Sequence, residues 1–180
     1  MERLLDIAKK EDILAEYRQT PIGYLLEFHN LNRPFEKYSQ AELLIGMCMD
    51  NRKHLHIPDN FAYVIRSGGA NLRFSEFKVS YAIAIGNIKH IALIGHNNCG
   101  MVNLNSRKQE FIQGLVENAG WDKKMALEHF MNFAPIFEIG SEIDFVINEA
   151  RRLRVRYPMI TVAPMLFNVN DNRLYHVLEK

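Results

Sequence analysis

Three residues of this chain have side chains that bind transition metals, and their spacing suggests that they meet at one ion. His96 and Cys99 are separated by two asparagines and directly follow an apolar run at 91–94, while Cys48 follows a second apolar run at 43–45. Two thiolates and one neutral imidazole are ligands suited to Zn²⁺. Because the chain has only two cysteines, a closed site with three or four thiolates is excluded. Three protein ligands leave one position for water, as in catalytic zinc sites.

A carboxylate and a guanidinium come directly after the first of these residues. Asp50 lies two positions after Cys48, and Arg52 lies two positions further on. In an extended segment the three side chains point the same way. A carboxylate held by a guanidinium stays ionised and can accept a hydrogen bond from the water on the metal. We therefore expect Asp50 to orient this water and Arg52 to fix Asp50.

Parallel strands are the elements that can bring these residues together. Residues 43–48, 61–65 and 91–94 read as buried strands, a glycine loop (66–71) follows the second, and a helix is predicted at about 74–84. Strand, loop, helix and strand form a βαβ unit, so the second and third strands should be parallel. The carboxyl ends of parallel strands are where open α/β sheets place their ligands. Cys48 and His96 would then lie at this edge, provided that the first strand joins the same sheet.

The rest of the chain predicts helices around that sheet. We expect an amphipathic helix from about Glu2 to Tyr17, mostly loop from Arg18 to Gln40, and two helices at about 105–118 and 123–133. Ser141 begins a capping box for a helix that runs to Arg156, and 159–169 with 173–178 reads as a terminal hairpin. The fold class is α/β: one domain with a mostly parallel central sheet flanked by helices, a C-terminal antiparallel hairpin strand and an N-terminal amphipathic helix.

Composition limits the possible partners and compartment. The 180 residues form one domain, divided into an N-terminal helix and extension (1–40), a metal-site core (41–102) and a helical segment with the C-terminal hairpin (103–180). A formal net charge of +1 does not indicate a protein that binds nucleic acid. The basic run at 151–156 is interpreted as the solvated end of a helix. No leader or membrane-spanning stretch is recognisable, and two distant cysteines do not form a disulfide framework, so we expect a cytoplasmic protein.

These motifs, in this order and separation, resemble those of the β-class carbonic anhydrases, in particular the compact members. The resemblance rests on Cys48-x-Asp50-x-Arg52, on Gly95-His96-x-x-Cys99-Gly100 and on the loop Arg66-Ser67-Gly68-Gly69-Ala70-Asn71, and it covers residues 43–102 closely. Differences from the family pattern, such as Ser67-Gly68 in place of Asn-Ala, leave the shape of the substrate pocket and the substrate preference open.

The resemblance implies a zinc lyase that reversibly hydrates CO₂ to bicarbonate and a proton, by attack of zinc-bound hydroxide. Cys48, His96 and Cys99 would bind one Zn²⁺ per chain, Asp50 and Arg52 would be catalytic, and the backbone at Gly68 and Gly69 would border the CO₂ pocket. The family also implies a homodimer or a larger homo-oligomer, with the N-terminal helix lying across the partner.

Other interpretations of the same residues remain open. Related enzymes with this metal site hydrolyse CS₂, a CO₂ analogue, and a third hypothesis is a zinc-holding bicarbonate sensor or assembly protein without turnover. Each cysteine alone would be read as an inert core residue, and Asp50 with Arg52 as a surface ion pair. His54 and His56 could relay protons, but we interpret them as solvated loop residues.

Overall fold

Four consecutive parallel strands form the centre of the molecule because their sequences are nearly continuous apolar runs. The computed structural model describes residues 3–179, and every residue of β2 (Leu43–Cys48) is buried, as are six of the seven residues of β4 (His90–His96). Strands buried on both faces are typical of parallel sheets with helices on either side. The sheet has the order β1-β6-β5-β4-β2-β3.

The directions of the strands confirm the predicted α/β class. β2 pairs in parallel with β3 (Ala62–Ser67) and with β4, and β4 pairs in parallel with β5 (Thr161–Asn168). β6 (Arg173–Val177) returns antiparallel to β5, as expected for the C-terminal hairpin. Because β2 lies between β3 and β4, the carboxyl ends of β2 and β4 are neighbours at one edge of the sheet.

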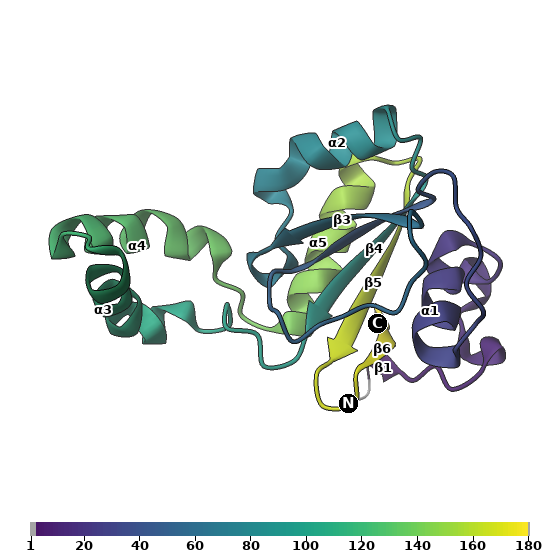
Figure 1. The fold of residues 1–180 in the computed structure, drawn as a ribbon, viewed down its shortest axis with the longest axis horizontal. Coiled ribbons are helices and arrows are strands. Elements are labelled where there is room, and N and C mark those ends of the chain that lie inside the picture. The colour runs from purple at the N-terminus through teal and green to yellow at the C-terminus, as the bar shows by residue number, and fades with distance from the viewer. Residues whose placement is uncertain (1–2, 180) are drawn as a thin grey trace.

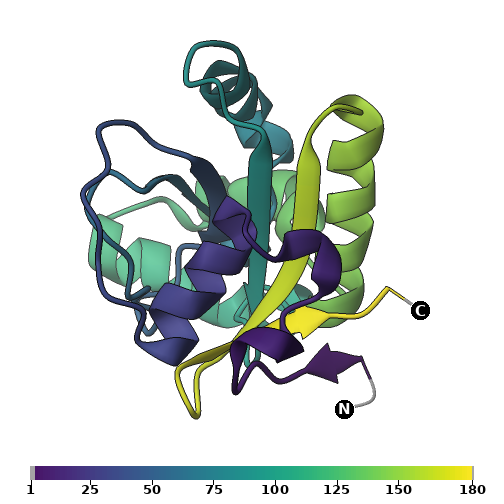
Figure 2. The ribbon, with the colours of Figure 1, turned by 90° about the vertical axis from the view of Figure 1, so that its right-hand side faces the viewer.

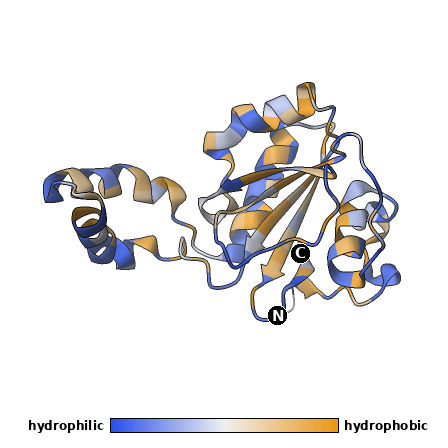
Figure 3. Ribbon diagram, in the orientation of Figure 1, coloured by the Kyte–Doolittle hydropathy of each residue, from blue (hydrophilic) through white to orange (hydrophobic). Residues whose placement is uncertain are grey.

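Helices cover both faces of the sheet, and each face has its own apolar core. One core joins α1 (Pro21–Leu31) to alternate residues of the central strands, such as Ile45 and Ile94. The other joins α2 (Glu76–Ala84) and α5 (Glu142–Arg156) to the opposite side chains, such as Leu44 and Leu93. Figure 2 shows α1 and α5 on either side of the strands, and the strands in Figure 3 are predominantly apolar.

Two further helices stand away from the sheet as a hairpin. α3 (Lys108–Ala119) and α4 (Lys123–Phe137) pack against each other and project to one side of the sheet (Figure 1). α3 ends at Gly120, which has a φ of +68°, and the Asp122 side chain accepts hydrogen bonds from the first turn of α4. No helix in the described range 3–179 has the length and apolar character needed to cross a membrane.

The predicted N-terminal helix is wrong for the residues that the structure describes; Glu2 lies outside them. Leu4 and Leu5 form the short strand β1, which pairs antiparallel with β6 of the same chain, and only short 3₁₀ turns follow, at 10–12 and 15–17. The apolar spacing resembled that of a helix, but Ile7 and Ile13 enter the core from an irregular backbone. Backbone N–H groups here are satisfied by β6 and by the Asp12 carboxylate, which accepts from Ala8 and Lys9. This part of the chain therefore completes its own sheet.

The expectation of a loop from Arg18 to Gln40 is also wrong in part, since α1 occupies Pro21–Leu31. Thr20 caps this helix through its hydroxyl, which accepts from Gly23 N at 3.4 Å, and Pro21 is its first residue. Proline is favoured at that position because its missing N–H would have no helical partner there. Asn32 ends the helix with a left-handed φ of 52°.

Candidate metal centre

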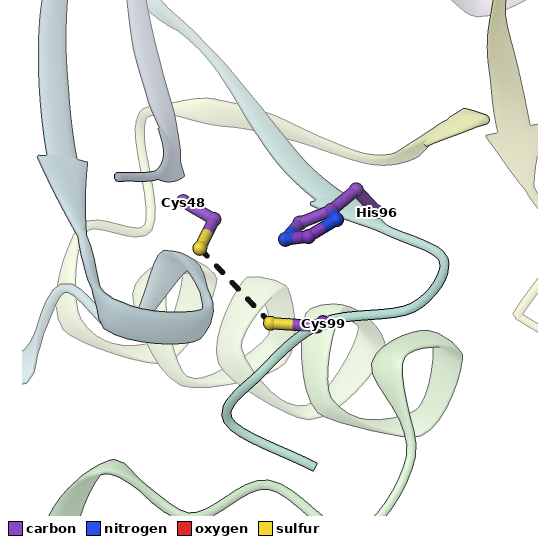
Figure 4. A group of neighbouring side chains, drawn as sticks. All are labelled: Cys48, His96 and Cys99. Carbon is purple, nitrogen blue, oxygen red and sulfur yellow. Dashed lines mark hydrogen bonds between the residues drawn. The ribbon is translucent and has the colours of Figure 1, made fainter. Parts of the chain in front are cut away.

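The structure brings Cys48, His96 and Cys99 together at the carboxyl edge of the sheet. Cys48 is the last residue of β2, His96 is the last residue of β4, and Cys99 lies in the turn that follows (Figure 4). All three are buried, and their ligand atoms lie within 4.8 Å of one another. This group can hold a metal ion.

The two sulfur atoms are spaced for a shared metal. The Sγ atoms of Cys48 and Cys99 are 4.0 Å apart, whereas a disulfide requires about 2.05 Å. Two sulfurs that each lie about 2.3 Å from a tetrahedral zinc are separated by about 3.8 Å. The observed spacing therefore fits zinc closely.

His96 presents one ring nitrogen to the cysteines. Its Nδ1 lies 2.9 Å from the carbonyl oxygen of Asn97, an arrangement in which Nδ1–H donates and Nε2 keeps a free lone pair. Nε2 is buried and has no hydrogen-bond partner among residues 3–179. A buried polar atom without a partner is unfavourable unless a ligand satisfies it, so this nitrogen is placed to bind a metal.

The pKa values of the two thiols are shifted in opposite directions. The neighbouring Cys99 thiol, whose sulfur lies 4.0 Å away, lowers the pKa of Cys48 despite its burial. The pKa of Cys99 is raised, because its thiol is the donor to Cys48 and because it is buried. Without a metal the pair therefore retains one proton, and a divalent ion would displace it.

Asp50 and Arg52 form an ion pair beside these residues. The Arg52 Nε lies 3.0 Å from Asp50 Oδ1, and Nη2 lies 2.6 Å from Oδ2, which holds the pKa of the Asp50 carboxyl well below its usual range. Asp50 Oδ2 is 3.8 Å from His96 Nε2. The expected extended geometry is wrong, since Arg52 N also donates to Asp50 Oδ1, at 2.9 Å, and closes a tight turn.

The glycine loop lies at the same edge of the sheet, next to Cys48. Ser67 is paired with Cys48 in the parallel ladder, and Gly68 and Gly69 follow it and are buried. Gly69 has a φ of +62°, which side chains rarely adopt. A Cβ atom on Gly68 would lie 3.3 Å from Met101 Sδ and from Phe137 Cδ1, so the absence of a side chain lets this apolar wall approach the loop.

Several residues of the site have no recognisable signal in the sequence. The Cys99 N–H donates to Glu142 Oε1 at 3.2 Å, which ties this cysteine to the first turn of α5. Lys53 is fully buried next to the Asp50–Arg52 turn. Arg66, which belongs to the glycine loop of the resemblance, fixes this turn by donating to the carbonyl oxygens of Asp50 and Lys53. Long-range contacts of this kind have no periodicity that a sequence pattern can reveal.

His54 and His56 do not belong to the group. Both are exposed, and His56 packs against the Phe35 ring with centroids 4.4 Å apart. The His56 N–H donates to His29 Nδ1 at 3.1 Å. These contacts favour the interpretation of loop histidines over that of a proton relay.

Comparison with known proteins identifies the fold. No family model and no curated protein matches the sequence. Among solved structures, β-carbonic anhydrase isoform I of Trichomonas vaginalis matches with a TM-score of 0.64 and 18% identity, covering 81% of this chain and 87% of that one. The chain has the β-carbonic anhydrase fold.

Two further structures share the β-carbonic anhydrase fold with this chain. The carbonic anhydrase of Glaciozyma antarctica matches with a TM-score of 0.59 and 19% identity, over 91% of this chain and 95% of that one. A carbon disulfide hydrolase in its apo form matches with a TM-score of 0.57 and 17% identity, over 78% and 80%. At such identities the β-carbonic anhydrase fold is shared, and the reaction has to be argued from the site.

Proposed function

We propose that this chain is a zinc-dependent carbonic anhydrase, which reversibly converts CO₂ and water to bicarbonate and a proton. The observation that carries the proposal is the convergence of Cys48, His96 and Cys99, with the unpaired His96 Nε2 facing the sulfurs and the Asp50–Arg52 pair beside them. Structures with the same fold are described as carbonic anhydrases, which supports this reaction.

The three ligand residues would hold one Zn²⁺ per chain. The two thiolates would balance its charge, and one of four coordination positions would be left for water. Zinc in this position would supply an acidified water molecule, which is the nucleophile that CO₂ hydration needs. The Asn97 carbonyl fixes the tautomer of His96, and the Glu142 carboxylate holds the Cys99 backbone, so the ligand side chains are positioned in advance.

Asp50 is assigned the role of a hydrogen-bond acceptor that orients the attacking water. Its Oδ2 lies 3.8 Å from His96 Nε2, which places the carboxylate next to the open side of the ligand group. Arg52 keeps it ionised and also donates to the Asn98 carbonyl at 3.0 Å, within the loop between His96 and Cys99. The pair therefore links the orienting carboxylate to the loop that carries a ligand.

An apolar wall beside the ligands suits a small uncharged substrate. Cys48 and Cys99 form a small buried cluster with Ile139, and Met101 packs against it. Gly68 and Gly69 let the same wall pack directly against the loop, since Cβ atoms there would contact Met101 and Ile139. We assign the CO₂ pocket to this region. We further propose a cytoplasmic protein, because two cysteines without a disulfide are typical of a reducing compartment. We also propose that it is a homodimer or larger homo-oligomer.

Metal analysis with pH-resolved kinetics tests the proposal. Purified protein should contain about one zinc per chain and should hydrate CO₂ in stopped-flow assays. Cys48→Ser should lose both, with zinc affinity reduced at least about 100-fold, since even outer-shell changes cost 10- to 100-fold. A Cys48→Ser protein with full zinc and full rate would disprove the ligand assignment.

Hydrolysis of CS₂ is the second candidate, favoured by the likeness to a carbon disulfide hydrolase. The turnover of CO₂ and CS₂ should be compared on the same zinc-loaded preparation. Turnover of CS₂ alone would replace the first proposal with this one. Zinc binding without turnover of either compound, at every pH, would favour a binding protein.

A further inference from the structure

Lys53 is a buried lysine whose charge has no direct partner in the described part of the chain. Its side chain is fully buried, and Nζ makes no hydrogen bond with any residue in the range 3–179. In the same range no carboxylate lies within ion-pair distance of it. Burying an ammonium group without a partner is strongly unfavourable, so nearby negative groups must compensate for its charge.

The compensating groups belong to the candidate metal centre. The negative groups that act most strongly on Lys53 are Cys48, then Asp50 and then Cys99. Burial has the largest effect and lowers the pKa of Lys53 overall, while these three groups act in the opposite direction and oppose the loss of its charge. Arg66 acts in the opposite sense, but it is exposed and screened by water.

The backbone is held so that this side chain enters the protein. Arg66 Nη2 donates to the Lys53 carbonyl at 3.2 Å, and its Nη1 donates to the Asp50 carbonyl at 3.3 Å. One guanidinium thus fixes both ends of the turn that carries Asp50, Arg52 and Lys53. The burial of Lys53 follows from a specific anchor and is therefore a defined feature of the site.

Counting charges shows what the buried ammonium adds. Two thiolates would cancel a divalent ion, and Arg52 neutralises Asp50 through their ion pair. Glu142 near Cys99 and Arg66 at the Lys53 carbonyl carry charges of opposite sign, so together they add no net charge. Lys53 then contributes one positive charge inside the protein, where water screens it poorly. Such an excess attracts a monovalent anion to the open side of the ligand group.

We infer that Lys53 is a positioning residue that makes this centre attract a monovalent anion, of which bicarbonate is the physiological example. This inference rests on the proposed function, because it assumes a divalent metal held by Cys48, His96 and Cys99. Lys53 acts through its charge and does not need to touch the anion.

Anion titration of the metal-loaded protein tests the inference without measuring turnover. The protein is loaded with Co²⁺, and azide binding is followed through the visible absorption of the metal. Lys53→Met and Lys53→Gln should weaken azide binding about 10- to 100-fold, as expected for loss of one poorly screened charge. Lys53→Arg should retain most of the affinity. The control is Lys89→Met, because Lys89 is exposed and lies next to the opposite end of β4. This change should leave azide binding unchanged.

Urea unfolding separates this role from a structural one. Removing a buried unpaired charge should leave stability of Lys53→Met unchanged or increased, while anion affinity falls. If Lys53 were purely structural, its replacement would lower the stability and leave the anion affinity unchanged. Failure of both neutral variants to fold would therefore contradict the inference.

The remaining outcomes distinguish the inference from the proposed reaction. Equal azide affinity in wild type and Lys53→Met at full cobalt loading would overturn the inference and leave CO₂ hydration intact. Weaker azide binding in the variant, in a protein without CO₂ turnover, would support the inference and count against the reaction. A wild-type chain that binds neither cobalt nor zinc would overturn both.

Discussion

Arg52 connects two parts of the candidate centre through one guanidinium. It donates to both carboxylate oxygens of Asp50 and to the carbonyl of Asn98, in the loop between His96 and Cys99. Charge-assisted bonds with this geometry fix orientation as well as protonation state. Although half-exposed ion pairs usually contribute little to stability, this one is placed to decide the state of a carboxylate beside a metal.

We expect Arg52→Met to retain zinc and to lose about 10- to 100-fold in CO₂ hydration, since no ligand changes but the orienting carboxylate is released. In wild type the lowered pKa keeps Asp50 ionised even at pH values near and below the ordinary pKa of an aspartate, about 3.9. In the variant this pKa rises toward about 3.9, so the acid-side loss of activity should move to higher pH. Stopped-flow rates from acid to neutral pH, with zinc analysis, measure both effects.

The control for this experiment is Arg156→Met. Arg156 makes a surface ion pair with Glu76, at 2.9 Å, far along α5 from the metal ligands. Its removal should change neither rate nor pH profile. An Arg52→Met protein with wild-type kinetics would show that the ion pair has no part in the reaction.

Gly69 and Gly120 have the same backbone conformation in different surroundings. Both have left-handed φ values, of +62° and +68°, but a Cβ on Gly69 would lie 3.2 Å from Ile139 Cγ2, whereas Gly120 has open space around it. Gly120→Ala should cost about 1 kcal/mol for the backbone alone. Gly69→Ala should cost more and should also weaken zinc binding, because its loop adjoins Cys48. Urea unfolding and zinc titration of the two variants measure these effects. Equal losses of stability and of zinc affinity in both variants would contradict the packing argument.

At the level of helices and loops, Glu149 fastens the segment after the glycine loop to α5. Its carboxylate is buried and accepts from the Leu72 N–H at 3.2 Å and from Arg152 at 2.8 Å. This contact holds the chain that leads from the metal-centre edge into α2. The buried Glu149 carboxylate is therefore the acceptor for a buried backbone N–H and for a guanidinium. Removing Glu149 removes both contacts at once.

Glu149→Ala should therefore destabilise the protein by about 1 to 3 kcal/mol, because the buried Leu72 N–H is left without an acceptor, while Arg152 keeps only its ion pair with Glu76. Glu110→Ala is the matched control, since Glu110 pairs with Arg107 on the exposed face of α3 and should have little effect. Urea denaturation of the three proteins gives the comparison. Equal stabilities of Glu149→Ala and wild type would show that the clamp is dispensable.

The same elements show what sequence patterns can and cannot predict. Strands β2 to β5, α2 to α5 and the hairpin were predictable because period and caps are local properties, such as Ser141 at the start of α5. The segment before Tyr17 was not predictable, since its apolar spacing fits both a helix and an irregular chain lying on the core. α1 had a usable signal in Thr20-Pro21, a capping residue followed by a proline at the first helical position, although we expected mostly loop in this segment.

For the candidate centre, the sequence predicted the side chains with diagnostic spacing and missed those with tertiary contacts only. Cys48, His96 and Cys99 could be expected to meet because strand ends in a parallel sheet are neighbours. Glu142 contacts the Cys99 backbone because α5 packs there, and Lys53 is buried because of how the Asp50–Arg52 turn packs. No local sequence pattern encodes either arrangement. Their roles, like those of the ligands, remain predictions to be tested by the experiments above.

Over the whole molecule, large apolar side chains gather on two surfaces that this chain leaves uncovered. β3 lies at the edge of the sheet, and with α2 it exposes Phe77 and Tyr81 beside a hollow of about 300 Å³. The α3–α4 hairpin, which stands clear of the sheet in Figure 1, has an apolar groove of about 660 Å³ that reaches Met101. Soluble monomers rarely expose contiguous apolar patches of this kind.

We therefore expect the protein to be a homodimer or larger in solution, with the β3–α2 surface buried between copies. Phe77 is 81% exposed in the single chain, and Phe77→Asp should shift the protein toward monomers by burying a charge in the interface. Val155→Asp is the control, because Val155 is 85% exposed, lies on α5 and is not among the residues that line the β3–α2 hollow. Sedimentation equilibrium over a range of concentrations should give at least twice the mass of one chain for wild type and for Val155→Asp. A wild-type protein that stays monomeric at all concentrations would contradict the prediction, and a Phe77→Asp protein that remains a dimer would move the interface to the α3–α4 groove.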